Sequence, residues 1–87
     1  MLNKVIITTY KVTINLLEAP MGAKVRIQRV DGDHALAFKL RQYGLFIGDQ
    51  VCLLRQAPFA GPVLLEINRR EIALSHDIAA KVFVEEI

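Results

Sequence analysis

The amino-acid sequence predicts a mainly β protein, a small barrel of about five short strands with one short α-helix and a few helical turns. Three observations lead to this prediction. The chain has 87 residues, which suits one small domain. Short segments of alternating apolar and polar residues recur along it, and glycine, proline or aspartate separates most of them. Closing such strands into a barrel covers the edges that an open sheet would expose.

The first part of the chain divides into an extension, a turn and a strand. Residues 1–12 are rich in β-branched side chains, and we expect them to form an N-terminal extension, as an extra strand or an ordered arm. Thr13 is the expected cap of a short turn that ends at residues 20–22. Residues 23–30 alternate with a period of two, which predicts the first strand of the barrel. The barrel domain should therefore span residues 13–87.

The spacing of apolar residues predicts one helix. Asp33 can accept a backbone N–H as the N-cap, and the helix should run to about Tyr43. Gly44 is suited to the left-handed conformation that ends a helix. Leu36, Leu40 and Tyr43 fall on one face, which we expect to join the core.

The second half of the chain predicts four further strands, at residues 50–56, 63–67, 70–74 and 81–86. Ser75 is expected to cap a single helical turn before the last of them. The expected core combines the inward positions of the strands and of the helix: Val25, Ile27, Leu36, Leu40, Val51, Leu53, Leu65, Ile67, Ile72, Leu74 and Val84.

Composition limits the function classes. Hydrophobic residues make up 53% of the chain and charged residues 23%, which excludes intrinsic disorder. The longest uncharged stretch has ten residues, against about 20 for a membrane span, so we expect no span and no targeting segment. A net charge of +2 with scattered cations does not indicate a nucleic-acid partner. A single cysteine fits a reducing compartment, and the cytoplasm is the expected location.

Two histidine–aspartate pairs are the only candidates for metal chemistry. Asp33 lies beside His34, and His76 lies beside Asp77. Imidazole with carboxylate suits ferrous iron, zinc or manganese. The spacing matches no metal motif, and nothing in the sequence brings the two pairs together. We therefore expect no required cofactor, and at most weak transition-metal binding at these residues.

Other polar residues do not indicate an enzyme. Cys52 lies within a predicted strand, where a free cysteine usually serves as a small buried hydrophobe. Ser75 is the only serine, and it is accounted for as a helix cap. Arg69 and Arg70 could contact phosphates, but no aromatic residues are interleaved with them, which is more typical of a solvated hairpin tip.

Bulky apolar residues in two loops are the more informative feature. Leu45, Phe46 and Ile47 follow the predicted helix, and Phe59 lies in the segment APFAGP. Such side chains either fold back into the core or stay exposed for a partner. Four of them exceed what a small barrel can bury, so these residues are the candidate partner-binding surface. Phe46 is the first choice because glycines bracket its loop.

Four segments resemble the FeoA family of small bacterial proteins that accompany the ferrous iron transporter FeoB. They are TINLLEAPMGAKVRI, HALAFKLRQYGLFIGDQV, APFAGPVLLEI and EIALSHDIAAKVFVEE, and they cover about residues 13–86. The resemblance implies an SH3-like barrel and a cytoplasmic accessory role in iron uptake through the transporter's cytosolic GTPase domain. Ile47 stands where the family usually has proline, and Asn68 to Arg70 replace a glycine-containing hairpin. No catalytic or ligand motif defines the family, so no site residue is carried over.

Three functional hypotheses follow. The first is a non-enzymatic regulatory protein of a FeoB-type transporter, without a membrane span of its own, recruited through the transporter to the inner face of the membrane. The second is a metal-responsive SH3-like domain, like those of iron-dependent repressors, with Asp33, His34, His76 and Asp77 as ligands. The third is a nucleic-acid-binding barrel, whose affinity would fall steeply with salt. Copies of the chain could also associate into a homo-oligomer.

Overall fold

The structure is a computed structural model, and it describes residues 12–87. The expected N-terminal extension lies outside the described residues except for Val12, which is exposed and belongs to no element. An extra strand in residues 1–11 therefore stays a prediction.

The described residues form a mainly β fold, which confirms the predicted class. Its strands are β1 (Thr13–Asn15), β2 (Lys24–Val30), β3 (Gln50–Gln56), β4 (Val63–Ile67), β5 (Arg70–Leu74) and β6 (Val82–Glu86). Its helical segments are the 3-10 helix η1 (Leu16–Glu18), the helix α1 (His34–Gln42) and the short helix α2 (His76–Ala79). The three strands predicted between residues 50 and 74 have the expected bounds.

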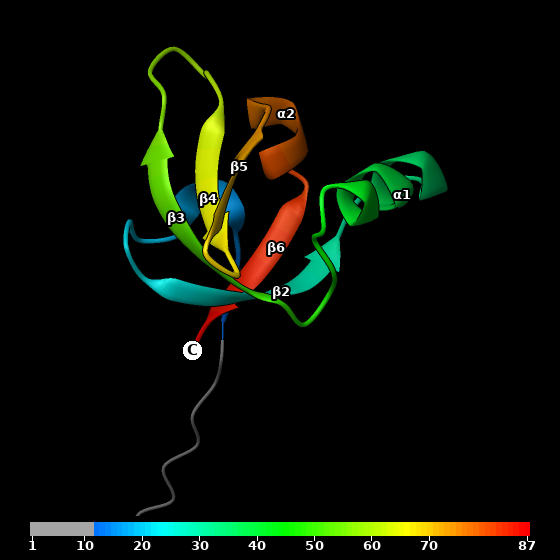
Figure 1. Cartoon of the computed structure of the whole chain (residues 1–87), viewed down its shortest axis with the longest axis horizontal. Coiled ribbons are helices and arrows are strands. Elements are labelled where there is room, and N and C mark those ends of the chain that lie inside the picture. The colour runs from blue at the N-terminus through cyan, green and yellow to red at the C-terminus, as the bar shows by residue number, and fades with distance from the viewer. Residues whose placement is uncertain (1–11) are drawn as a thin grey trace, which may run out of the picture.

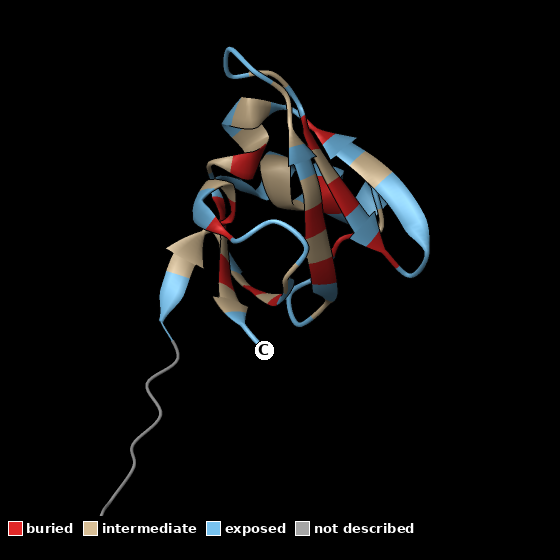
Figure 2. Ribbon diagram, turned by 90° about the vertical axis from the view of Figure 1, so that its left-hand side faces the viewer, coloured by how far each residue is buried: buried red, intermediate tan, exposed pale blue. Residues whose placement is uncertain are grey.

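All strands belong to one antiparallel sheet with the order β1-β6-β2-β3-β4-β5. The sheet curls around a single core (Figure 1). Its inward positions pair across neighbouring strands, as Ile27 with Val84 in β2 and β6 and Leu53 with Leu65 in β3 and β4. Buried residues therefore alternate with more exposed ones along β2, β3, β4 and β6 (Figure 2), as the period-two pattern predicts.

The start of the domain differs from the expectation. Thr13 does not cap a turn, because residues Thr13–Asn15 form the strand β1 and pair with β6. The cap of η1 is Asn15, whose Oδ1 accepts the N–H of Leu17 at 3.0 Å while its side-chain amide donates to the carbonyl of Ala80. The sheet therefore has six strands in the described residues rather than about five. The short strand was missed because three residues are too few to establish a period.

The core contains most of the expected residues and several more. Its buried members are Leu16, Ala19, Val25, Ile27, Leu40, Leu45, Val51, Leu53, Val63, Leu65, Ile67, Leu74, Ala79, Val82 and Val84. Leu36 and Ile72, both expected in the core, are partly buried and pack against it. Tyr43 is 37% exposed, so the core-facing stripe of the helix ends before it.

The predicted caps of the two α-helices are confirmed. Asp33 Oδ1 accepts the N–H of Leu36 at 2.9 Å at the start of α1, and Ser75 Oγ accepts the N–H of Ile78 at 3.3 Å at the start of α2. Gly44 follows α1 with a φ of 86°, the left-handed conformation expected of it. A Cβ at Gly44 would lie 2.7 Å from Nη2 of Arg70, but this flexible side chain can move aside, so the positive φ is what favours glycine here.

Candidate partner-binding groove

Helix α1 lies beside the barrel, next to the end of β2, rather than across the core (Figure 1). Leu40 is its one buried residue, and Leu36 packs against the core one turn earlier. Lys39 and Arg41 lie in its last turn, where cations interact favourably with the helix dipole. Because α1 packs against the core mainly through Leu36 and Leu40, part of its barrel-facing side stays uncovered.

The loop between α1 and β3 is fastened to the rest of the fold. The N–H of Leu45 donates to the carbonyl of Leu40 at 2.9 Å, and the Leu45 side chain is buried. Asp49 Oδ2 accepts the N–H of Phe46 at 2.9 Å. The N–H of Gly48 donates to Ile27 at 2.8 Å, and that of Ile27 donates to Asp49 at 2.9 Å. These hydrogen bonds therefore hold the loop in a fixed place against β2.

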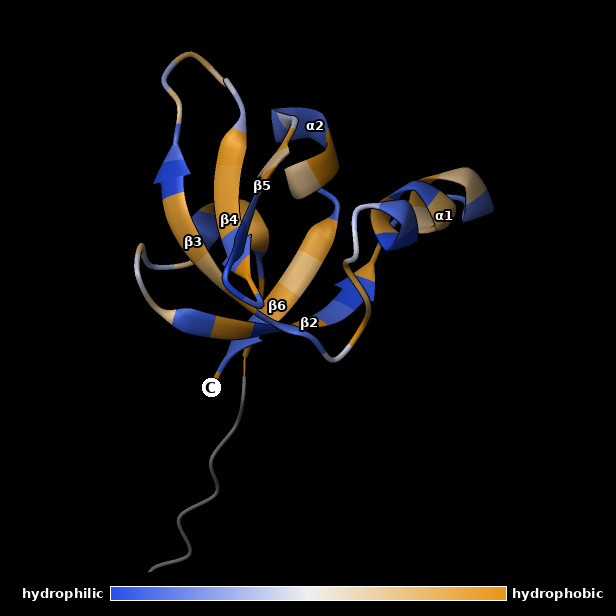
Figure 3. Ribbon diagram, in the orientation of Figure 1, coloured by the Kyte–Doolittle hydropathy of each residue, from blue (hydrophilic) through white to orange (hydrophobic). Residues whose placement is uncertain are grey.

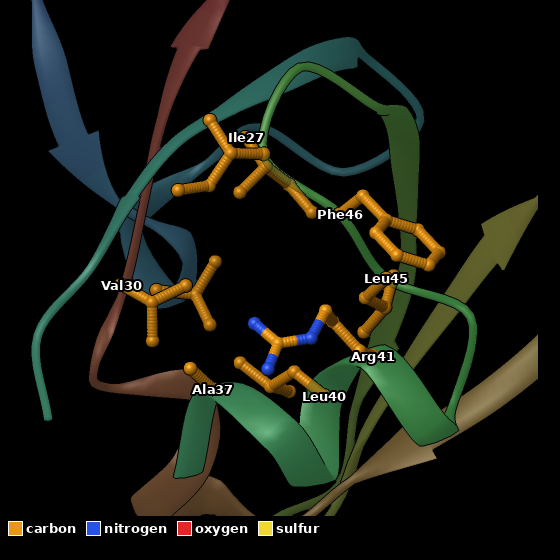
Figure 4. Close-up of a pocket in the computed structure, with 9 residues that line it drawn as sticks. Ile27, Val30, Ala37, Leu40, Arg41, Leu45 and Phe46 are labelled. Carbon is orange, nitrogen blue, oxygen red and sulfur yellow. The ribbon is translucent and has the colours of Figure 1, made fainter. Parts of the chain in front are cut away.

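A groove of about 310 Å³ lies between α1, this loop, and strands β2 and β6 (Figure 4). Its lining is apolar except for one residue: Ile27, Val30, Ala37, Leu40, Arg41, Leu45, Phe46, Ile47 and Val82. The guanidinium of Arg41 points into the middle of the space (Figure 4). We call this feature the α1 groove. Its floor consists of core residues, so its apolar surface is continuous with the core.

The structure brings three of the four candidate partner-binding residues together. Leu45 is 4% exposed and serves as floor rather than as contact surface. Phe46 and Ile47 line the groove with exposed fractions of 50% and 69%. Phe59 is 100% exposed at the tip of the β3–β4 loop, away from α1 (Figure 1). The two loops carry two separate apolar features (Figure 3).

Sequence reasoning missed the helical side of the groove. Ala37, Leu40 and Arg41 share one face of α1 because their spacing is i, i+3 and i+4. The signal that could have found Arg41 is this spacing, which puts a long cationic side chain beside a core leucine.

The candidate metal ligands do not form a site. Asp33 and His34 are exposed at the start of α1, and the Asp33 carboxylate is engaged as the helix cap. His76 is partly buried and Asp77 is exposed at the start of α2. Within residues 12–87 no three histidine, cysteine, aspartate or glutamate side chains gather as metal ligands could. The two pairs are thus not combined into a common set.

Cys52 is not the buried residue that its strand suggested. It is partly buried on the outward face of β3, between Lys24 of β2 and Glu66 of β4. The reason is the strand period, because its neighbours Val51 and Leu53 take the inward positions.

One exposed ion pair lies at the end of β2. Arg29 Nε donates to Asp31 Oδ1 at 2.8 Å, and the Arg29 guanidinium lies 4.2 Å from the ring centroid of Phe83. The hydrogen bond with Arg29 lowers the pKa of Asp31, and the same bond raises the pKa of Arg29. Both side chains are about half exposed, so the pair is a surface feature.

Comparisons with solved structures agree on the fold. A crystal structure of an iron uptake regulatory protein, FeoA, has a TM-score of 0.77 at 24% identity, covering 87% of this chain and 99% of that one. The solution structure of iron(II) transport protein A from Clostridium thermocellum has a TM-score of 0.77 at 27% identity, covering 85% of this chain and 46% of that one. The repressor ScaR with bound Zn²⁺ has a TM-score of 0.77 at 30% identity; the match covers 85% of this chain but only 37% of ScaR. No curated protein sequence gives a significant match.

No helix within residues 12–87 is long and apolar enough to cross a membrane. The model of the FeoA domain family, which is associated with ferrous iron transport, matches residues 14–86, nearly the whole chain. The chain therefore belongs to the FeoA domain family.

Proposed function

We propose that this protein is a non-enzymatic accessory protein of ferrous iron uptake, and that it binds the cytosolic GTPase domain of a FeoB-type transporter through the α1 groove. The observation that carries the proposal is the exposed apolar rim of Phe46 and Ile47 on a groove floored by core residues. The protein acts in the cytoplasm and is recruited to the inner face of the membrane by that contact.

The chemistry of the groove fits a protein segment. An apolar lining with one cation accepts an apolar anchor whose neighbouring carboxylate pairs with Arg41. Exposed aromatic residues at such sites often dominate binding, at about 2 kcal/mol or more on truncation. Phe46 is the aromatic residue in this lining.

The loop is also prepared for binding before the partner arrives. The N–H of Phe46 donates to Asp49 Oδ2 and the N–H of Gly48 donates to the carbonyl of Ile27, which fixes the backbone on both sides of Ile47. Little conformational freedom is then lost on association, which favours affinity.

The test is the variant Phe46→Asp, measured by calorimetric titration against the transporter's cytosolic GTPase domain and by thermal unfolding. Because Phe46 is half-exposed, we expect the variant to fold and its affinity to fall about 30-fold or more. Met21→Asp is the matched control, since Met21 is 58% exposed in the turn before β2, on the far side of the barrel from α1 (Figure 1).

Two outcomes contradict the proposal. A folded Phe46→Asp variant that binds as the natural protein does would exclude the groove as the contact. Failure of the natural protein to bind the GTPase domain would exclude the partner. If Phe46→Asp does not fold, Ile47→Asp replaces it, because Ile47 is more exposed.

The similarity to ScaR favours the metal-responsive alternative at the level of the fold. The residues of this chain do not fit it, because within the described residues the two histidine–aspartate pairs form no common ligand set. Titration with ferrous and zinc ions distinguishes the two functions. Stoichiometric binding at micromolar concentration or tighter, lost in His34→Ala or His76→Ala, would support the metal-responsive function.

A further inference from the structure

The backbone conformation of the β3–β4 loop keeps the side chain of Phe59 in solvent. Phe59 lies at the tip of this loop and is 100% exposed. Phe59 and Ala60 have φ angles of 58° and 56°, in the left-handed region that residues other than glycine rarely adopt. Each such residue costs about 1–2 kcal/mol. The loop is therefore strained and also leaves the aromatic ring of Phe59 in water. Such a loop is suited to contact with another protein surface.

The loop is also rigid and uncharged. The N–H of Ala57 donates to the carbonyl of Pro62 at 2.9 Å, and that of Gly61 donates to Pro58 at 3.1 Å. No charged residue occurs from Gln56 to Leu65. These hydrogen bonds order the backbone that carries the aromatic side chain, so docking the loop costs little backbone entropy.

The α1 groove is a receptor of matching size and chemistry. About 310 Å³ is at the lower limit of ligand pockets, which suits a single ring with part of its loop. The Arg41 guanidinium points into the groove (Figure 4), where a cation attracts the face of an aromatic ring. The apolar walls accept the proline and alanine residues that flank the ring.

We propose that, when no transporter domain occupies the α1 groove, Phe59 of one copy of this chain binds there in a second copy. The β3–β4 loop lies away from helix α1 (Figure 1), which lines the groove, so a chain cannot fill its own groove with this loop. The contact joins two unlike surfaces, and in the head-to-tail form that we propose each molecule offers a loop to one neighbour and a groove to another.

Charge favours this occupant over the chain's own N-terminal segment. Residues 1–11 contain Lys4 and Lys11 and no carboxylate, so they would bring like charge to Arg41. The β3–β4 loop brings an aromatic face and no charge.

The buried area makes the association weak. An aromatic side chain buries about 150–250 Å². Even with the flanking residues and the groove walls, the contact stays below the roughly 1,200 Å² of a stable interface. We expect a concentration-dependent equilibrium with a dissociation constant on the order of 100 µM or higher.

The test uses sedimentation equilibrium of the full chain from about 50 µM to 1 mM, with no transporter present, so that its result does not depend on the proposed function. Phe59→Asp removes the inserting ring, and Ile47→Asp places a carboxylate on the groove rim. Each variant alone should show association at least 10-fold weaker than the natural protein. An equimolar mixture should recover pairs, because one variant keeps its groove and the other its ring, but no larger species.

Further variants separate this contact from others. Arg41→Gln should weaken association by a factor of about 3 to 10, because it removes the cation and keeps the length. Met21→Asp should associate as the natural protein does. Thermal unfolding checks that every variant is folded, and Phe46→Asp replaces Ile47→Asp if the latter is not.

Three results would overturn the proposal. The first is a natural protein that stays monomeric over the whole concentration range. The second is Phe59→Asp associating as the natural protein does, which would place the contact elsewhere. The third is a mixture of the two folded variants that recovers no pairs.

Discussion

The two loops that carry exposed phenylalanines are built in opposite ways. The α1–β3 loop gives its left-handed positions to Gly44 and Gly48, with φ angles of 86° and 95°. It sends Leu45 into the core and hydrogen-bonds to β2. The β3–β4 loop places Phe59 and Ala60 in the left-handed region, and its backbone hydrogen bonds there close only on itself.

The difference separates a loop that belongs to the fold from one that projects from it. In the α1–β3 loop, glycine occupies each left-handed position, and the exposed residues are those that remain after the others have packed into the core. In the β3–β4 loop, the sequence accepts backbone strain, and the exposed ring has no packing reason to be there. Similar apolar composition thus conceals two different energetic roles.

The largest expected effect tests whether the α1–β3 loop is part of the core. Leu45→Ala should lower the free energy of unfolding by about 2–5 kcal/mol, as should Leu40→Ala, because both remove buried methyl groups and leave a cavity. Phe59→Ala should leave it nearly unchanged, since its ring makes no buried contact. Urea denaturation measures all three. Equal losses in Leu45→Ala and Phe59→Ala would erase the distinction between the loops.

A glycine substitution tests the backbone of the same loop. Gly48→Ala should cost about 1–2 kcal/mol. The cost is conformational alone, because a Cβ at Gly48 meets no atom within 4 Å. Urea denaturation should show a lower midpoint at an unchanged slope. A variant as stable as the natural protein would mean that the loop relaxes to another conformation.

The opposite substitution in the β3–β4 loop should have the opposite sign. Ala60→Gly should raise the free energy of unfolding by up to about 1 kcal/mol, because glycine adopts a φ of 56° without the steric cost. The gain is reduced by the greater freedom of glycine in the unfolded chain. Thermal unfolding of Ala60→Gly and Gly48→Ala under the same conditions gives the comparison directly. A loss of stability in Ala60→Gly would show that the strain is not where the φ angles place it.

The smallest effect is expected for the ion pair of Arg29 and Asp31 at the end of β2, which lies in neither loop. Because the folded pKa of Asp31 is lowered from its ordinary value of 3.8, its stabilising contribution is present above that value and is lost as the pH falls through the folded pKa. The melting temperature of Asp31→Asn should therefore approach that of the natural protein in acid. A difference that persists unchanged below this range would assign the effect to something other than the carboxylate charge.

Much of this fold could be predicted from the sequence because its signals are local. Asp33 and Ser75 cap their helices through hydrogen bonds that span three residues, and the strands from Gln50 to Leu74 are bounded by turn residues in the chain itself. Strand β1 could not be predicted, because three residues carry no period and their partner in β6 lies about 70 positions away.

The candidate site divides along the same line. The sequence by itself determined that two loops carry four bulky apolar residues, namely Leu45, Phe46, Ile47 and Phe59. Only the tertiary structure decided that Leu45 turns inward, that Phe46 and Ile47 join Arg41 at a groove, and that Phe59 stands apart from them. The physical reason is that hydrophobicity fixes a preference for burial but no direction, whereas the direction of each side chain depends on which strand and helix the fold places beside it.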